Sequence, residues 1–111
     1  GAFPLWCAPV QARILPISDE VNEYARSVFN AFSTEGFRVE LDVRGETLNK
    51  KIREATLAKI PYLIIIGKKE AEAGKLSVRS YFDGDLGEMS LAEISARMRE
   101  EIDGKVYRRK T

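Results

Sequence analysis

The sequence contains no histidine and only one cysteine, Cys7, among its 111 residues. Without histidine the chain cannot carry Ser-His-Asp or Cys-His catalysis, and most zinc sites are excluded as well. A single cysteine forms neither an internal disulfide nor a cysteine metal cluster. These absences point away from an enzyme active site within these residues.

Long hydrophobic runs are also absent. The longest purely apolar run, Tyr62–Ile66, has five residues, whereas a transmembrane helix needs about 20. No basic segment followed by a long apolar stretch opens the chain, so we expect neither a signal peptide nor a membrane span. Hydrophobic residues make up 44% of the sequence and charged residues 32%, which is typical of one ordinary folded domain.

Positive charge is concentrated in the middle of the chain, although the net charge is only +1. Residues 1–43 carry a net charge of −3, residues 44–79 carry +5 and residues 80–111 carry −1. A basic surface of this kind can steer a polyanion towards the protein. A solvated helix face rich in lysine produces the same count, and charge alone favours that simpler interpretation.

Strand and helix signals alternate from residue 10 to residue 104. Branched apolar or alternating residues predict strands at residues 10–17, 37–43, 62–66 and 75–82. Ser18, Thr47 and Ser90 are residue types that cap helices, and each precedes an apolar stripe with helical spacing. The segments between the later elements, residues 67–74 and 83–85, are expected to form turns.

This order of elements predicts the fold class. Strands that alternate with helices favour right-handed parallel connections, and the half-solvated strand at residues 75–82 favours an antiparallel partner. We therefore predict an α/β protein, a three-layer α/β/α sandwich with a mixed sheet of four or five strands and three main helices. Residues 1–9 are expected to be an extended lead-in, and residues 105–111 a tail.

Several segments share their order and spacing with one known family. They are Phe3–Gln11 (FPLWCAPVQ), Lys51–Ala55 with Lys59–Tyr62, Gly67–Glu70, Gly74-Lys75, Val78-Arg79 and Asp85–Gly87. In these segments the chain resembles the C-terminal anticodon-binding domain of threonyl-tRNA synthetases, which are class II aminoacyl-tRNA synthetases. The resemblance runs from Phe3 to Gly104, and the lead-in is more similar to the threonyl branch than to the prolyl, histidyl or glycyl enzymes.

The resemblance implies a division of labour within a longer protein. Residues 1–9 would form the junction with a catalytic domain, residues 10–104 the anticodon-binding domain and residues 105–111 the tail. The chain would read the anticodon loop of threonine tRNA, in which guanine and uracil are the invariant second and third anticodon bases. The catalytic domain of the same polypeptide would act as threonine–tRNA ligase, with ATP, magnesium and a catalytic-domain zinc as cofactors. The resemblance also implies a cytoplasmic, homodimeric parent, no cofactor in this chain and a monomeric isolated domain.

The resemblance further implies which residues contact the anticodon. They are Gly45, Glu46, Lys59, Glu70 and Arg79. The family often has a polar residue at the position of Gly45, so a base contact there would have to come from the backbone. Glu70 in its turn and Arg79 on the next strand are expected to meet at one end of the sheet, where acceptors and donors together suit a guanine or uracil edge.

Four further residues are candidates for contacts with the RNA backbone or for stacking. They are Lys50, Lys51, Arg53 and Tyr81. The three cations are expected largely outside the buried stripe of the second helix, and Tyr81 is expected on the same face as Arg79.

Most of these residues also have an interpretation that needs no RNA. Lys59 would complement a helix dipole, and Glu70 would be an ordinary turn charge. Arg79 would protect an edge strand, and Tyr81 would pair with an aromatic residue across the sheet. The alternative functions are therefore a protein-interaction or accessory-subunit module with the same fold, or the equivalent domain of a prolyl-, histidyl- or glycyl-tRNA synthetase.

Overall fold

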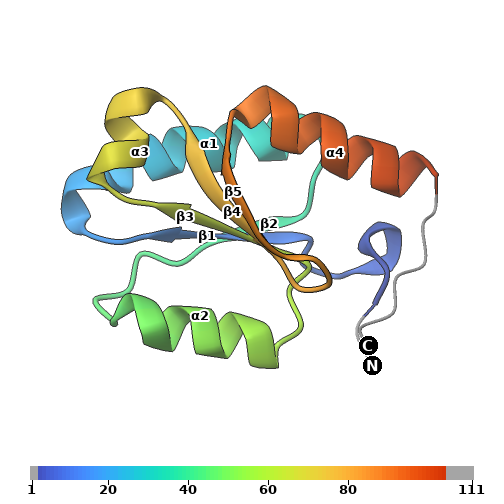
Figure 1. Ribbon diagram of the computed structural model, residues 1–111, viewed down its shortest axis with the longest axis horizontal. Helices are drawn as coiled ribbons and strands as arrows, with labels where there is room; N and C mark the ends of the chain where they lie inside the picture. The colour runs from blue at the N-terminus through green and yellow to red at the C-terminus, as the bar shows by residue number, and fades with distance from the viewer. Residues whose placement is uncertain (1–2, 105–111) are drawn as a thin grey trace.

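Five strands and four α-helices alternate along residues 3–104, the part of the chain that the computed structural model describes (Figure 1). In chain order the elements are the 3-10 turn η1 (Leu5–Cys7), β1 (Ala12–Pro16), the 3-10 turn η2 (Asp19–Val21), α1 (Asn22–Thr34), β2 (Val39–Leu41), α2 (Leu48–Leu57), β3 (Tyr62–Ile66), α3 (Lys68–Ala73), β4 (Leu76–Ser80), β5 (Gly84–Met89) and α4 (Leu91–Asp103). The tail predicted at residues 105–111 lies outside the described residues.

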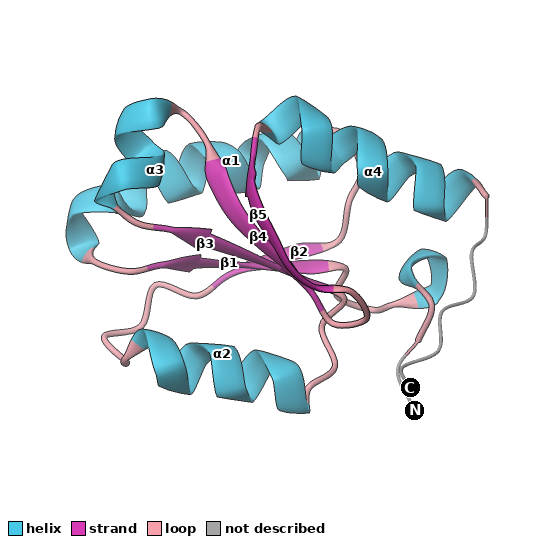
Figure 2. Cartoon of the chain, viewed as in Figure 1, coloured by secondary structure: helices cyan, strands magenta, loops and turns pink. Residues whose placement is uncertain are grey.

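The strands form one mixed sheet in the order β2-β1-β3-β4-β5. Strand β1 pairs in parallel with both β2 and β3, whereas β3–β4 and β4–β5 are antiparallel pairs. Helix α2 lies on one face of the sheet, and α1, α3 and α4 lie on the other (Figure 2). The predicted three-layer sandwich with a mixed sheet and three main helices is therefore confirmed.

Hydrophobic side chains fill two cores, one on each face of the sheet. The larger core, against α1 and α4, includes Ile14, Phe32, Ile64 and Met98, which are fully buried. The smaller core, against α2, consists of Leu15, Ala55, Ile60, Leu63 and Ile65. No residue of β4 or β5 belongs to this smaller core. Helix α2 therefore does not cover these two strands on the face of the sheet where it lies.

The sequence of β3 is apolar without alternation because the strand is buried on both of its faces. Ile64 and Ile66 enter the larger core, and Leu63 and Ile65 enter the smaller one. All five residues of the strand are buried, as the continuous run predicted. Because each buried branched side chain contributes roughly 1.5–3 kcal/mol, this strand fixes the position of every element that packs on it.

The helix caps are confirmed at two of the three predicted positions. The Thr47 and Ser90 hydroxyls accept hydrogen bonds from the backbone N–H groups of Lys50 and Glu93, at 3.2 and 3.1 Å. Ser18 makes no such bond and precedes the short turn η2, so the first α-helix begins three residues later than predicted. Gly36, with φ of 90°, supplies the left-handed residue expected after α1.

Three predicted segments are wrong in type. Residues 67–74 are not a charged turn, because they contain the helix α3, which ends at Gly74 with φ of 67°. Residues 83–85 are not only a turn, because β5 begins at Gly84, and a register shift at Val78 and Arg79 lets this glycine-containing strand pair with β4. The lead-in is not extended throughout, because it contains the turn η1, whose Leu5 is buried in the larger core.

Candidate nucleic-acid interface

Three loops meet where the parallel strands β1, β2 and β3 end. The strand register pairs Ile14 with Leu41 and Pro16 with Ile66, so the segments that follow these residues lie at one edge of the sheet. A hollow of about 320 Å³ at this edge is lined by residues 16–19, Asn22, residues 43–46 and Lys51. Ligands of α/β sheets bind at the carboxyl ends of strands, and this edge carries Gly45, Glu46 and, at the start of α3, Glu70.

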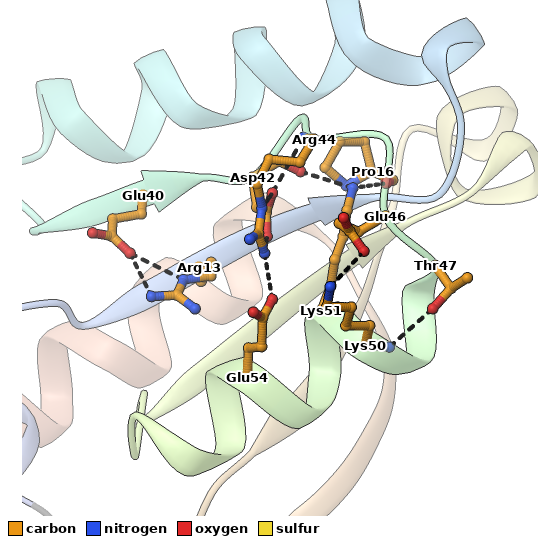
Figure 3. A network of polar contacts seen from close by, with 10 residues as sticks. All are labelled: Arg13, Pro16, Glu40, Asp42, Arg44, Glu46, Thr47, Lys50, Lys51 and Glu54. Carbon is orange, nitrogen blue, oxygen red and sulfur yellow. Dashed lines mark hydrogen bonds and ion pairs between the residues drawn. The ribbon is translucent and has the colours of Figure 1, made fainter.

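A network of polar contacts holds the loop between β2 and α2 in place (Figure 3). Arg44 contacts Asp42 at 2.8 Å and Glu54 at 2.6 Å, and Lys50 contacts Glu46 at 3.0 Å. The hydrogen bonds from Arg44 hold the pKa of Asp42 below its ordinary value. The hydrogen bonds of Arg44 with Asp42 and Glu54 in turn raise the pKa of Arg44. Two of the nine cations of residues 44–79 are therefore engaged with carboxylates in this loop.

Lys51 contradicts the prediction that it contacts the RNA backbone. Its residue is 3% exposed, and its ammonium group donates hydrogen bonds to the carbonyls of Pro16 at 3.2 Å and Asp42 at 3.0 Å. The lysine reaches under the loop and joins α2 to the ends of β1 and β2 (Figure 3). Its role is structural, because a buried ammonium group bound to two carbonyls cannot also meet a phosphate.

The backbone conformation at Gly45 does not require a glycine. It is exposed and is not among the four glycines with positive φ, and a Cβ atom added there would meet no atom within 4 Å. Turn geometry alone therefore does not require glycine at this position. Its backbone is open to solvent beside Arg44 and Glu46, the arrangement that a backbone contact needs.

Glu70 is neither an ordinary turn charge nor a wholly free carboxylate. Its Oε1 accepts a hydrogen bond of 2.6 Å from the backbone N–H of Gly67, which caps the first turn of α3. The residue is half-buried. One carboxylate oxygen thus fixes the helix start, and the second remains to accept a hydrogen bond from a ligand.

Arg79 lies at the other end of the sheet. It pairs in register with Leu63, near the amino end of β3, and its side chain is exposed. A groove of about 390 Å³ opens beside it, between α2 and the hairpin of β4 and β5; it is lined by Ile52, Thr56, Ile60, Leu63 and residues 79–85. This cavity, here called the Arg79 groove, is in the size range of ligand pockets, about 300–1,000 Å³. Tyr81 lines it too, from the turn after β4, with its ring edge-on to Phe82 at 5.2 Å.

The expected meeting of Glu70 and Arg79 at one end of the sheet is wrong. Glu70 follows the carboxyl end of β3, whereas Arg79 stands beside Leu63 near the amino end. Gly67 lies four positions after Leu63, and strands rise about 3.3 Å per residue, so the start of α3 and the level of Arg79 are roughly 13 Å apart along β3. This separation favours contacts with different nucleotides.

Lys59 is held in an unusual conformation. It is the only non-glycine residue with positive φ within residues 3–104, at 58°, and its side chain is exposed just after α2. The left-handed conformation costs an ordinary residue about 1–2 kcal/mol. This conformation ends α2, because the backbone N–H groups of Lys59 and Ile60 donate hydrogen bonds to the carbonyls of Thr56 and Ala55 at 3.0 and 3.1 Å.

Most cations of the middle segment are free of carboxylates. Six of them form no ion pair within the described part of the chain: Arg53, Lys59, Lys68, Lys69, Lys75 and Arg79. All six are exposed. The positive charge inferred from the sequence is therefore carried by α3, the end of α2 and β4 rather than by Lys51.

Two further properties of residues 3–104 bear on function. No helix among them is both long enough and apolar enough to cross a membrane. No group of three or more His, Cys, Asp or Glu side chains in that range could hold a metal ion.

Comparison with known proteins identifies relatives over nearly the whole chain. The sequence model of the family described as "Anticodon binding domain" matches residues 11–101. Threonine–tRNA ligase of Prosthecochloris aestuarii is 51% identical over 105 residues, which cover 95% of this chain and 16% of that protein. The ligase of Caldanaerobacter subterraneus subsp. tengcongensis is also 51% identical with the same coverage.

A solved structure matches as well. The RNA-binding domain of threonyl-tRNA synthetase from Cryptosporidium parvum Iowa II superposes with a TM-score of 0.86 at 33% identity, covering 91% of this chain and 26% of that chain. The present chain thus spans about one sixth of the curated ligases that it matches. Its sequence matches the anticodon-binding domain model, and its fold matches the RNA-binding domain of that synthetase.

Proposed function

The chain belongs to the anticodon-binding domain family, and from this premise we propose that it reads the anticodon loop of threonine tRNA. The observation that carries the proposal is the exposed Arg79, which forms no ion pair within residues 3–104 and stands beside the Arg79 groove. The threonine–tRNA ligases that are 51% identical to the chain support the choice of tRNA. Sequence-specific RNA recognition targets unstacked loop bases, and a groove beside an arginine suits such a base.

The residues divide into two groups with different tasks. The Arg79 guanidinium offers a planar donor fork to base acceptors, and the second oxygen of Glu70 can accept a hydrogen bond from the N1 or N2 donors of guanine. Because the two lie at opposite ends of β3, each serves a different nucleotide. Arg53 on α2 and Lys59 just after it are exposed and suit phosphate contacts, which position the loop without specifying its sequence.

The longer protein would complete the reaction. We propose that a catalytic domain in the same polypeptide, outside this chain, joins threonine to its tRNA with ATP, magnesium and a zinc ion. The parent would be a cytoplasmic homodimer, and the isolated chain a monomer. The chain itself would supply recognition and positioning only.

A protein-interaction module is the competing proposal. The six exposed cations without carboxylate partners favour RNA, because neutralising phosphates with such groups releases counterions and gives tight binding at low salt. Binding to the stem-loop should therefore weaken steeply as the salt concentration rises. A protein partner held mainly by apolar contacts would show a weaker dependence on salt, because salt screens only the charged contacts.

The test compares Glu70→Gln and Arg79→Ala with the parent chain on anticodon stem-loops that differ only in the invariant guanine or the invariant uracil. Each variant should lose about 1–3 kcal/mol of binding to the threonine stem-loop and less to the stem-loop with the wrong base. Because the two residues are far apart, each variant should lose discrimination at a different base. Arg26→Ala is the matched control for Arg79→Ala, since Arg26 is exposed on α1, on the face of the sheet opposite the Arg79 groove. Equal weakening of every stem-loop by both variants would contradict base reading.

A further inference from the structure

The turn between β4 and β5 forms one wall of the Arg79 groove and is also held by α4. The groove is lined by Asp83, Gly84 and Asp85 of this hairpin. The guanidinium of Arg97, on α4, contacts the Asp83 carboxylate at 2.8 Å. Because α4 and α2 cover opposite faces of the sheet (Figure 1), this contact connects the groove to the helix on the far side.

A second contact anchors Arg97 to the centre of the sheet. Its Nε donates a hydrogen bond of 3.1 Å to the hydroxyl of Tyr62, and that hydroxyl donates one of 2.8 Å to Glu101. Tyr62 is 1% exposed on β3, and its burial raises the pKa of its phenol to about 12. The phenol is therefore protonated at neutral pH and can serve both partners. Arg97 thus connects Asp83 in the hairpin turn to Tyr62, which is buried in the centre of the sheet.

The turn is also braced from within. The Ser80 hydroxyl accepts hydrogen bonds from the backbone N–H groups of Phe82 and Asp83, at 3.2 and 3.1 Å. These bonds set the local shape of the turn, but they do not fix its position relative to α2 and the groove floor. The Arg97 contact supplies that second constraint, because it ties Asp83 to β3 and α4.

We propose that Arg97 is a positioning residue for the Arg79 groove: it holds the β4–β5 turn so that the groove fits one unstacked base of the bound RNA. This inference rests on the proposed function. Arg97 acts through Asp83, because its Nε is already bound to Tyr62 and one terminal nitrogen to Asp83. A groove whose wall shifts loses discrimination between bases, because base contacts depend on geometry far more than phosphate contacts do.

The experiment measures binding of the parent chain, Arg97→Met and Asp83→Asn to the threonine stem-loop and to one with its middle guanine replaced. Each variant should bind the threonine stem-loop roughly five- to tenfold more weakly, the lower part of the range for a base contact. The ratio between the two stem-loops should fall, and the salt slope should stay that of the parent. The double variant should lose no more than Arg97→Met alone, because the Arg97–Asp83 contact is already absent from that variant.

Two control variants separate positioning from other roles. Arg99→Met removes the same charge from the same helix, but Arg99 contacts the Glu35 carbonyl and the Phe37 ring, far from the groove, so it should leave discrimination unchanged. Arg97→Lys keeps the charge without the planar fork and should behave like Arg97→Met. All measurements are made at a temperature at which circular dichroism shows each variant folded.

The outcomes are distinct. If Arg97→Met and Arg97→Lys bind and discriminate like the parent, the inference is wrong even when Arg79→Ala loses discrimination. If Arg97→Met lowers the salt slope by about one unit, Arg97 contacts a phosphate directly and does not act through Asp83. If the parent chain itself does not distinguish the two stem-loops, the proposed function fails, and the inference fails with it.

Discussion

Replacing Lys51 by methionine tests the structural role of the one candidate cation that is buried. The substitution keeps most of the side-chain volume and removes the ammonium group that binds the carbonyls of Pro16 and Asp42. Hydrogen bonds from a charged group contribute about 1.5–3 kcal/mol each, and relief from burying the charge offsets part of the loss. We expect Lys51→Met to lower the free energy of unfolding by about 2–3 kcal/mol, or the melting temperature by roughly 10 °C.

The assay is urea unfolding followed by circular dichroism, together with stem-loop binding at several salt concentrations. The salt slope of Lys51→Met should equal that of the parent, because a buried ammonium group neutralises no phosphate. Lys50→Ala is the neighbouring control: it removes an exposed ion pair with Glu46, which contributes only about 0–1 kcal/mol. If Lys51→Met keeps the parent's stability and loses about one unit of salt slope, Lys51 contacts RNA and the structural assignment is wrong.

Two further predictions follow from backbone conformation and from charge. Lys59→Gly should raise the free energy of unfolding by about 1 kcal/mol, because glycine adopts the left-handed conformation freely, and should lower the salt slope of RNA binding; unchanged stability in urea unfolding would contradict the first part. The pKa of Asp42 is lowered from 3.8 by its hydrogen bonds to Arg44, so its contribution to stability is present above that pH and is lost as the pH falls through the lowered value. The free energy of unfolding of Asp42→Asn should therefore fall less steeply than that of the parent as the pH is lowered into the acid range. If the two proteins lose stability equally in acid, Asp42 does not stabilise the fold through Arg44.

Local patterns were sufficient to predict the central part of the fold. The unbroken run of β3 reflects burial on both faces, and the caps at Thr47 and Ser90 depend only on bonds to residues three positions away. These features are encoded within a few neighbouring residues. The parallel order of β1, β2 and β3 followed from the lengths of their connections.

Short or irregular elements were not predictable in the same way. Helix α3 has six residues and no buried one, so it offers no apolar stripe from which a helix could be inferred. Strand β5 contains Gly84 and Gly87, both with positive φ, which are typical of turns. The expected meeting of Glu70 and Arg79 failed because β4 runs antiparallel to β3 and carries Arg79 back to Leu63, near the amino end of β3.

The candidate site was predictable in part. Exposed cations such as Lys59 and Arg79 lie on the polar side of their elements, as their spacing indicates. Lys51 occupies a similar position in the sequence, yet its partners lie 35 and 9 residues away. Arg97 likewise depends on Tyr62 and Asp83, which belong to other elements. Contacts that are long in sequence leave no periodic signal, so only the fold reveals which charges are structural.

The most direct test of the central proposal is equilibrium binding of the parent chain to two anticodon stem-loops at two salt concentrations. One stem-loop carries the threonine anticodon, and the other differs only in its middle guanine. We expect the substitution to weaken binding roughly 5- to 150-fold, and we expect both affinities to fall as salt rises while their ratio is maintained. Equal affinity for the two stem-loops would contradict recognition of the anticodon by this chain.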